Sequence, residues 1–226
     1  ADPLNLRAHI ALGMAELRRG RAQEGYTHLR GAYSRCLQER RPLDAMRCAF
    51  GLANASVQLG SLEDAERFTE AAQEAASAAG SARGLAECDT YFGEISRQQG
   101  DYALAEHHYR LALAGLRAVD PEEAWVAEVN LGSALLQQGR TDEARIHLEA
   151  VWAWSEANST LLAMASAAGM LGCLARDGSD AEWAVWCARM QRLVDGSDYV
   201  ELDLAQLLDL ATARADGHPD RAAEAA

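Results

Sequence analysis

Histidines are the residues of this sequence that most resemble metal ligands. His28, His108 and His147 each stand three residues after a small residue that recurs along the chain. Imidazole nitrogens bind a metal at about 2.1 Å, but equivalent positions in successive helix pairs lie roughly 10 Å apart. The neighbouring residues His107 and His108 point to different sides of a helix and are not a chelating pair. The spacing therefore predicts a structural role for these histidines and no metal site.

The cysteines form no redox or zinc pattern. The five are Cys36, Cys48, Cys88, Cys173 and Cys187, without a C-x-x-C pair, and all fall in segments expected to be helical. Free cysteine behaves as a small buried hydrophobe, so we predict core thiols in a reducing compartment. No apolar run approaches the ~20 residues that span a bilayer, and no signal-peptide pattern is present. We therefore expect a cytoplasmic protein without a membrane partner.

The remaining chemistry is excluded by composition and motif. All 21 basic residues are arginine, so lysine-based catalysis is ruled out. No phosphate loop, G-x-S-x-G or H-E-x-x-H motif occurs. The formal charge of −13 argues against nucleic acid or an anionic membrane as the main partner. We predict that this chain is not an enzyme and holds no cofactor.

Tryptophan is confined to one part of the chain. All five tryptophans lie between Trp125 and Trp186. We expect Trp152 and Trp183 to fill the core. Tryptophan is also enriched at interface hot spots, and Trp154 and Trp186 are the candidates for that role.

A recurring helix–turn–helix unit must position all of these residues. In the stretch Leu131–Ala144, Gly139 can adopt the positive φ that ends a helix, and Thr141 or Asp142 can cap the next one. The same frame begins at residues 12, 52, 92, 131 and 171, in steps of 40, 40, 39 and 40. A period of 20–50 residues is typical of a solenoid or similar array.

Hydrophobic periodicity and turn signals give the expected architecture. We predict an all-α solenoid of antiparallel helix pairs, with no strand, as one domain over residues 1–226. Asp120 followed by Pro121 is a strong helix start. The chain begins within a helical pattern and stops soon after Pro219, so we expect a piece of a longer protein. The repeats are expected at residues 4–40, 43–80, 82–119, 121–158 and 160–196, with a partial sixth at 198–226.

These residues resemble the tetratricopeptide repeat (TPR). The third repeat carries the family signature as Phe92-Gly93, Gly100, Ala105, Tyr109 and Ala112. The fifth is the weakest, with Ala184 at the small position of its second helix and Ala188 in place of the large residue. The period here exceeds the usual 34 residues, as in Pins-type adaptors, kinesin light chains and bacterial regulatory proteins. The resemblance implies a right-handed superhelix whose first helices line a concave peptide-binding face.

Counting from the first residue of each Leu-Gly pair, the inner positions fall at −5, −2, +2, +5 and +6. These offsets share one helix face. The candidate groove residues are Arg7, Met14, Arg47, Phe50, Asn54, Gln58, Glu87, Glu94, Arg97, Gln98, Ser133, Gln137 and Arg176. The carboxylate clamp of some TPR proteins needs basic residues around Asn54, where Phe50 and Gln58 stand instead, so we do not expect a chaperone-tail adaptor.

The function predicted from this reasoning is a protein-interaction scaffold. Its concave groove would hold a partner peptide or helix, as part of a larger bacterial regulatory or signalling protein. One alternative is a regulatory or sensory region that acts on a neighbouring kinase or ATPase module. Another is self-association through the unpaired end of the sixth repeat, which would give a homo-oligomer.

Overall fold

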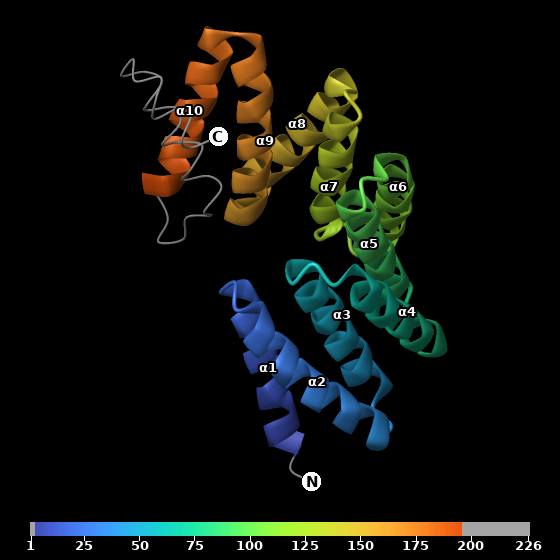
Figure 1. Cartoon of the computed structure of the whole chain (residues 1–226). Helices are drawn as coiled ribbons and strands as arrows, with labels where there is room; N and C mark the ends of the chain where they lie inside the picture. Colours follow the sequence, from blue (N-terminus) through green and yellow to red (C-terminus); the bar gives the residue numbers. More distant parts are fainter. Residues whose placement is uncertain (1–2, 196–226) are drawn as a thin grey trace. The chain divides into compact units, whose positions relative to one another are not determined.

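A computed structural model describes residues 3–195, with side chains except at 3–5, 177–178 and 194–195. This part of the chain contains ten α-helices and no strand (Figure 1). The helices are α1 (Pro3–Arg18), α2 (Ala22–Gln38), α3 (Pro42–Gln58), α4 (Leu62–Ala78), α5 (Ala82–Gln98), α6 (Tyr102–Val119), α7 (Ala124–Gln137), α8 (Thr141–Asn158), α9 (Leu161–Gly178) and α10 (Asp180–Asp195). The predicted all-α helix-pair architecture is confirmed. The partial sixth repeat, expected at 198–226, lies outside the described residues.

The chain divides into two compact units. Unit 1 comprises Ala1–Ala127 and holds α1 to α6 with the first residues of α7. Unit 2 comprises Glu128–Ala226 and holds the rest of α7 with α8 to α10. The single domain predicted over residues 1–226 stays a prediction. Within residues 3–195, no helix combines the length and the apolar character that crossing a bilayer demands.

Left-handed residues close most of the helices that begin a repeat. Gly139 has φ +74° between α7 and α8, as predicted, and Gly20, Gly60 and Gly100 share this conformation. The capping prediction is wrong in detail, since Thr141 is the first residue of α8 and the N-cap is Arg140, without a side-chain hydrogen bond. α8 begins at Thr141, directly after the turn that Gly139 makes, so its N-cap is Arg140 and neither predicted residue.

Glycines of the first helix meet large residues of the second helix in the third and fourth repeats. A Cβ built on Gly93 of α5 would lie 2.6 Å from the Tyr109 ring of α6. A Cβ on Gly132 of α7 would lie 2.9 Å from Leu148 of α8. Both large side chains are fully buried. The glycines thus allow each helix pair to approach closely, which is the packing predicted from the repeat signature.

The fifth repeat reaches the same contact with different residues. Gly172 of α9 is met by Met190, whose Cε lies 3.2 Å from a Cβ built there, and by Trp183. Ala184, expected at the small position of α10, is exposed, whereas Trp183 is buried. The prediction for Ala184 is therefore wrong. The α9–α10 connection is a single extended residue, Ser179, in place of the glycine turn.

The predicted helix start at Pro121 is also wrong. Residues 121–123 form a turn, and α7 begins at Ala124. Asp120 ends α6 as its C-cap and does not cap α7. Its carboxylate instead pairs with Arg83, 2.6 Å away on α5. A tertiary ion pair thus replaces the local capping bond, and Glu123 in the turn lines a cavity of unit 1.

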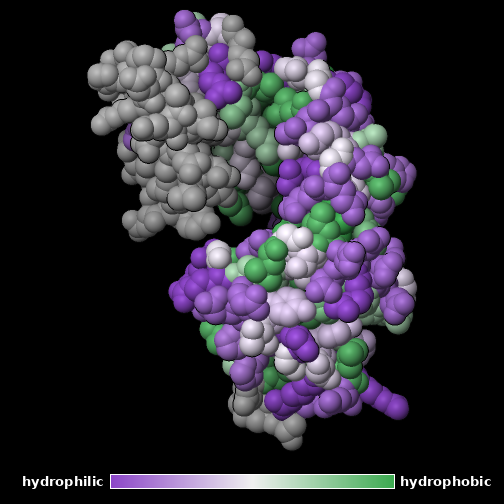
Figure 2. Space-filling model, viewed as in Figure 1, coloured by the Kyte–Doolittle hydropathy of each residue, from purple (hydrophilic) through white to green (hydrophobic). Residues whose placement is uncertain are grey.

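The core and surface divide as the composition predicts. Cys36, Cys48 and Cys88 are fully buried, which confirms them as core thiols, while Cys173 and Cys187 are partly exposed. Burial, above all, raises the pKa of Cys88 to about 12, so this thiol stays protonated near neutral pH. On the coloured surface visible in Figure 2, polar residues predominate and apolar groups appear as separate patches.

Candidate functional site

A cavity of about 510 Å³ opens in unit 1. Its wall comes from α1, α3 and α5, the first helices of three successive repeats, and from the α6–α7 region. The lining residues are Met14, Met46, Arg47, Phe50, Ser81, Arg83, Gly84, Glu87, Thr90, Tyr91, Leu116, Glu123 and Val126. The volume lies within the ~300–1,000 Å³ typical of ligand pockets.

Two methionines line the cavity because glycines make room for them. The Met14 sulfur lies 2.8 Å from the position of a Cβ on Gly51 of α3. The Met46 sulfur lies 2.9 Å from the position of a Cβ on Gly84 of α5. Any larger residue at either glycine would push its methionine away. Methionine is flexible and polarizable, so it presents an apolar surface that adapts to different ligands.

An aromatic pair joins the second and third repeats in the cavity wall. Phe50 of α3 and Tyr91 of α5 stack with ring centroids 5.4 Å apart and planes inclined by 17°. Burial and then the charge of Glu87 raise the pKa of Tyr91 to about 12, against a hydrogen bond with Asn54 that lowers it. Tyr91 is therefore a neutral phenol across the physiological range. The pair gives a ligand an apolar face with one hydroxyl.

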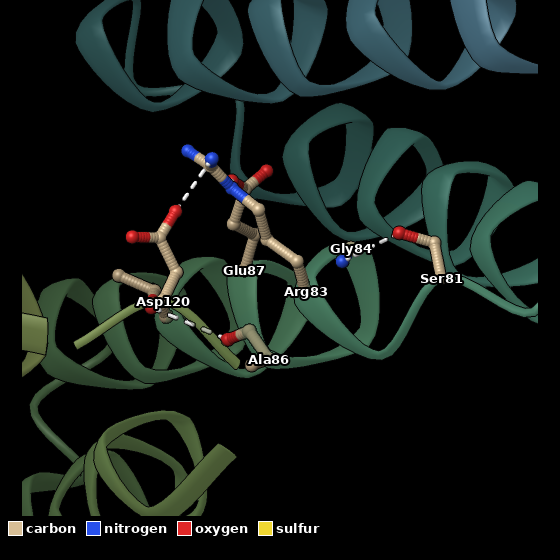
Figure 3. Close-up of polar contacts among 7 residues, drawn as sticks. Ser81, Arg83, Gly84, Ala86, Glu87 and Asp120 are labelled. Carbon is tan, nitrogen blue, oxygen red and sulfur yellow. Dashed lines mark hydrogen bonds and ion pairs between the residues drawn. The ribbon is translucent and has the colours of Figure 1, made fainter. Parts of the chain in front are cut away.

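Charged groups gather on the α5 and α6–α7 side of the cavity. Arg83 pairs with Glu87 at 2.8 Å and with Asp120 at 2.6 Å (Figure 3). The pKa of Arg83 is raised, above all by its hydrogen bond to Glu87. Burial lowers this pKa, but the negative charges of Glu87, Asp120 and Glu123 raise it further. One guanidinium thus stands among three carboxylates. Negative charge is in excess on this side.

A second arginine lines the cavity. Arg47 lies on α3 and is exposed. No hydrogen bond or ion pair holds its guanidinium among the residues that the structure describes. Met46, its neighbour in the sequence, reaches α5, where its sulfur lies 2.9 Å from the position of a Cβ on Gly84. The cavity lining therefore combines an arginine that makes no ion pair with a group in which carboxylates outnumber arginine.

Four of the predicted groove residues line this cavity. They are Met14, Arg47, Phe50 and Glu87. Thr90 and Val126 also line it and occupy the inner offsets −2 and −5 of their repeats. Met46, Tyr91 and Glu123 fall outside the five offsets and were missed. A signal for Met46 was present in its spacing from Phe50, four residues on along the same helix face.

Other predicted groove residues bond to one another. Gln58 donates to Asn54 at 2.8 Å on α3. On α5, Arg97 binds the two Glu94 oxygens at 2.8 and 2.6 Å, and Gln98 donates to Glu94 at 3.0 Å. These side chains form hydrogen-bonded polar groups on α3 and α5. Their role in binding stays a prediction.

The Glu94 cluster also holds the hairpin of the third repeat together. The Tyr109 hydroxyl of α6 donates to Glu94 at 3.1 Å. Burial disfavours the charged form of Glu94, but hydrogen bonds from Arg97, Gln98 and Tyr109, with the Arg97 charge, outweigh it and lower the pKa of Glu94. Burial and the Glu94 charge raise the pKa of Tyr109. The carboxylate therefore stays ionised under a neutral phenol.

The remaining predicted groove residues lie elsewhere. Arg7 is exposed on α1 of unit 1. In unit 2, Ser133 is half-buried and Gln137 exposed on α7, and Arg176 is half-buried on α9. None of them lines the cavity of unit 1. Whether they contact a ligand stays a prediction.

The tryptophans of unit 2 form a packed cluster. Trp152 and Trp183 are buried, so their predicted core role is confirmed. Trp186 is only 5% exposed and packs edge-on against Trp152, 5.1 Å between centroids, with Arg189 stacked 4.4 Å from its ring. Its predicted role as an interface residue does not fit this burial. Trp154 is partly exposed, and its interface role stays a prediction.

The recurring histidines pair within their own repeats. His108 and His147 contact Asp89 and Glu128 at 3.2 Å, each on the preceding helix. His28 instead packs its ring 5.7 Å from that of His9. These contacts give the histidines the structural role that their spacing predicts. Among the described residues, no cluster of three or more histidine, cysteine or acidic side chains is arranged to hold a metal ion.

Comparison with known proteins yields matches only among solved structures. No family model matches the sequence, and no curated protein does. The apo form of RapI aligns over 100% of this chain and 82% of its own, with TM-score 0.77 and 13% identity. A Rap conjugation gene regulator of the plasmid pLS20, in complex with the Phr* peptide, gives 0.74 and 15%, covering 97% of this chain and 64% of its own.

A third similar structure is itself built of TPR-like repeats. TPR-like repeats of a kinesin light chain from Podosopora anserina align over 88% of this chain and 99% of their own, with TM-score 0.60 and 16% identity. The fold is that of the TPR-like helical repeats. This confirms the fold that the repeat signature implied. At such low identity the likeness concerns the fold alone.

Proposed function

We propose that this chain is a non-catalytic protein-interaction scaffold whose unit 1 cavity binds a peptide or helix from a partner. The observation that carries the proposal is the cavity itself. Its wall combines Met14, Met46 and the Phe50–Tyr91 stack with a few charged groups. Ligand sites commonly pair an apolar wall with a small number of placed polar groups.

The arrangement of the helices around the cavity also supports this role. The wall comes from the first helix of three repeats, so a ligand would contact several repeats at once. Helix-in-groove and extended-peptide recognition both use such apolar hollows. One protein of similar fold was solved in complex with the Phr* peptide. The same mode of use is proposed for this chain.

The proposed context is a larger bacterial regulatory or signalling protein in the cytoplasm. Three fully buried cysteines support a reducing compartment. Similarity of fold to a conjugation gene regulator supports a regulatory role. Binding of the partner would then be reported to other parts of that protein or to its targets.

The test places a bulky side chain in the cavity and measures how the affinity for a peptide changes. Random heptapeptides displayed on phage are selected against the chain, and the tightest is measured by fluorescence polarisation. Thr90→Trp places an indole in the cavity from α5, and we expect affinity to fall at least tenfold. Thr27→Trp on α2 is the matched control, because both threonine hydroxyls bond the carbonyl four residues back.

Helical content and melting temperature establish that each variant is folded. If Thr90→Trp does not fold, Val126→Trp fills the cavity from α7. Equal affinities of the wild type and of a folded cavity-filling variant would overturn the proposal. So would a selection that yields no binding peptide.

A further inference from the structure

Sulfur and aromatic groups make up much of the apolar lining of the cavity. Phe50 of α3 belongs to a buried cluster against which Met46 and Tyr91 pack, and the two rings stack 5.4 Å apart. Met14 adds a second sulfur from α1. Thioether sulfur makes favourable contacts with aromatic rings, and aromatic rings attract one another beyond the area they bury. This lining therefore favours an aromatic ring over an aliphatic group of the same size.

Arg47 adds a cation to the same wall. It precedes Phe50 by three residues on α3, so the two side chains are neighbours on one helix face, and both line the cavity. Arg47 is exposed and makes no ion pair among the described residues. A guanidinium is attracted to the face of an aromatic ring and stacks on it. A ring that packs over Phe50 lies within reach of this side chain.

Unit 2 contains the same combination of groups within the protein itself. Arg189 of α10 lies over the face of Trp186, with 4.4 Å from the guanidinium carbon to the ring centroid. Trp186 in turn packs edge-on against Trp152. Arg189 makes no ion pair in the part of the chain that the structure describes. An arginine without a carboxylate partner thus covers an aromatic ring that rests on a second ring.

We propose that the cavity of unit 1 binds one aromatic side chain of the partner peptide, which is a phenylalanine, tyrosine or tryptophan. Its ring packs against Met46 and the Phe50–Tyr91 stack, and the Arg47 guanidinium covers its other face. This inference rests on the proposed function, because it names the residue by which the peptide is held in the same cavity.

The charges of the lining disfavour a charged anchor. Arg83 is already bound by Glu87 and Asp120, and the chain carries a formal charge of −13, so an acidic anchor would be repelled on approach. A basic anchor would lose hydration against the methionines and the aromatic stack and would face Arg47 as a like charge. A neutral ring avoids both costs.

The test compares an aromatic ring with a saturated ring of the same size. In the heptapeptide selected above, the aromatic residue is made phenylalanine and then cyclohexylalanine, which keeps the six-membered ring and loses its π electrons. We expect the cyclohexylalanine peptide to bind about three- to tenfold more weakly. Arg47→Gln and Met46→Leu should each weaken the phenylalanine peptide about two- to fivefold and leave the affinity for the cyclohexylalanine peptide unchanged.

Matched controls make the same substitutions outside the cavity. Arg30→Gln on α2 removes an exposed arginine that makes no ion pair among the residues described. Met170→Leu on α9 replaces a partly exposed methionine of unit 2. Neither control should change the preference for phenylalanine over cyclohexylalanine. Circular dichroism verifies that each variant is folded.

The outcomes separate this inference from the proposed function. Equal affinities for the two peptides, while Thr90→Trp still abolishes binding, would overturn the aromatic anchor and leave the cavity as the binding site. Selected peptides without an aromatic residue would do the same, as would a preference that neither Arg47→Gln nor Met46→Leu reduces. Binding that is indifferent to Thr90→Trp would overturn both.

Discussion

Gly93→Ala tests the close approach of α5 and α6 in the third repeat. The added methyl would stand 2.6 and 2.7 Å from the Cε1 and Cδ1 atoms of Tyr109. The ring cannot move aside easily, since Tyr109 is fully buried and its hydroxyl donates to Glu94. Overpacking of this kind costs about 1–3 kcal/mol, and we expect a value near the upper end.

The helical propensity of alanine partly offsets this cost. Alanine in place of glycine within a helix contributes about 1 kcal/mol of stability. Gly31→Ala on α2 isolates that contribution, because a Cβ at Gly31 has no neighbouring atom within 4 Å. We therefore expect Gly31→Ala to stabilise the chain by roughly 0.5–1 kcal/mol and Gly93→Ala to destabilise it by about 1–2 kcal/mol.

The two variants are compared by urea unfolding, followed by circular dichroism at 222 nm. Propensity cancels in the difference between them, which should equal the overpacking cost of about 2–3 kcal/mol. The wild-type and variant m-values should agree, so that the midpoints report stability. If Gly93→Ala proves as stable as Gly31→Ala, the helices are not in the close contact described for this hairpin.

Three further changes test other contacts. Tyr109→Phe removes the hydrogen bond to the ionised Glu94, and urea midpoints should show a loss of about 1.5–3 kcal/mol; an unchanged midpoint would mean that the bond does not form. Because the pKa of Glu94 is lowered in the folded chain, its stabilisation is complete above the unfolded pKa and is lost as pH falls through the folded value. The stability advantage of wild type over Glu94→Gln should therefore shrink between pH 6 and pH 3, and a constant advantage across that range would refute the assignment. Arg40→Gly relieves a left-handed residue at φ 53° and should raise the melting temperature by about 2–4 °C, whereas a fall would show that the arginine side chain stabilises that turn.

Helices and hairpin contacts could be predicted from the sequence because their causes are local. The Leu-Gly spacing and Gly139 place the turns, and the structure has helices close to the predicted ranges. The predicted start at Pro121 failed because Asp120 is held by Arg83, 37 residues earlier in the chain. Such a tertiary ion pair overrides a local capping signal, and the spacing of residues in the sequence does not predict it.

The candidate site could be predicted only in part. Offsets from the repeat frame locate Met14, Arg47 and Phe50, since inner faces recur with the period. They do not locate Tyr91, whose ring lines the cavity by stacking on the preceding repeat. Nor do they locate Glu123, which the turn after α6 brings to the cavity. Side-chain contacts between repeats depend on helix separation, and the period does not encode it.

Methionine methyl groups offer the most direct test of binding in the cavity. The chain has five methionines, of which Met14 and Met46 line the cavity of unit 1. The other three, Met164, Met170 and Met190, lie in unit 2. With ¹³C-methyl methionine, titration of the selected heptapeptide should shift the signals of Met14 and Met46 and leave those of unit 2 in place. Shifts confined to the unit 2 methionines would contradict a binding site in this cavity.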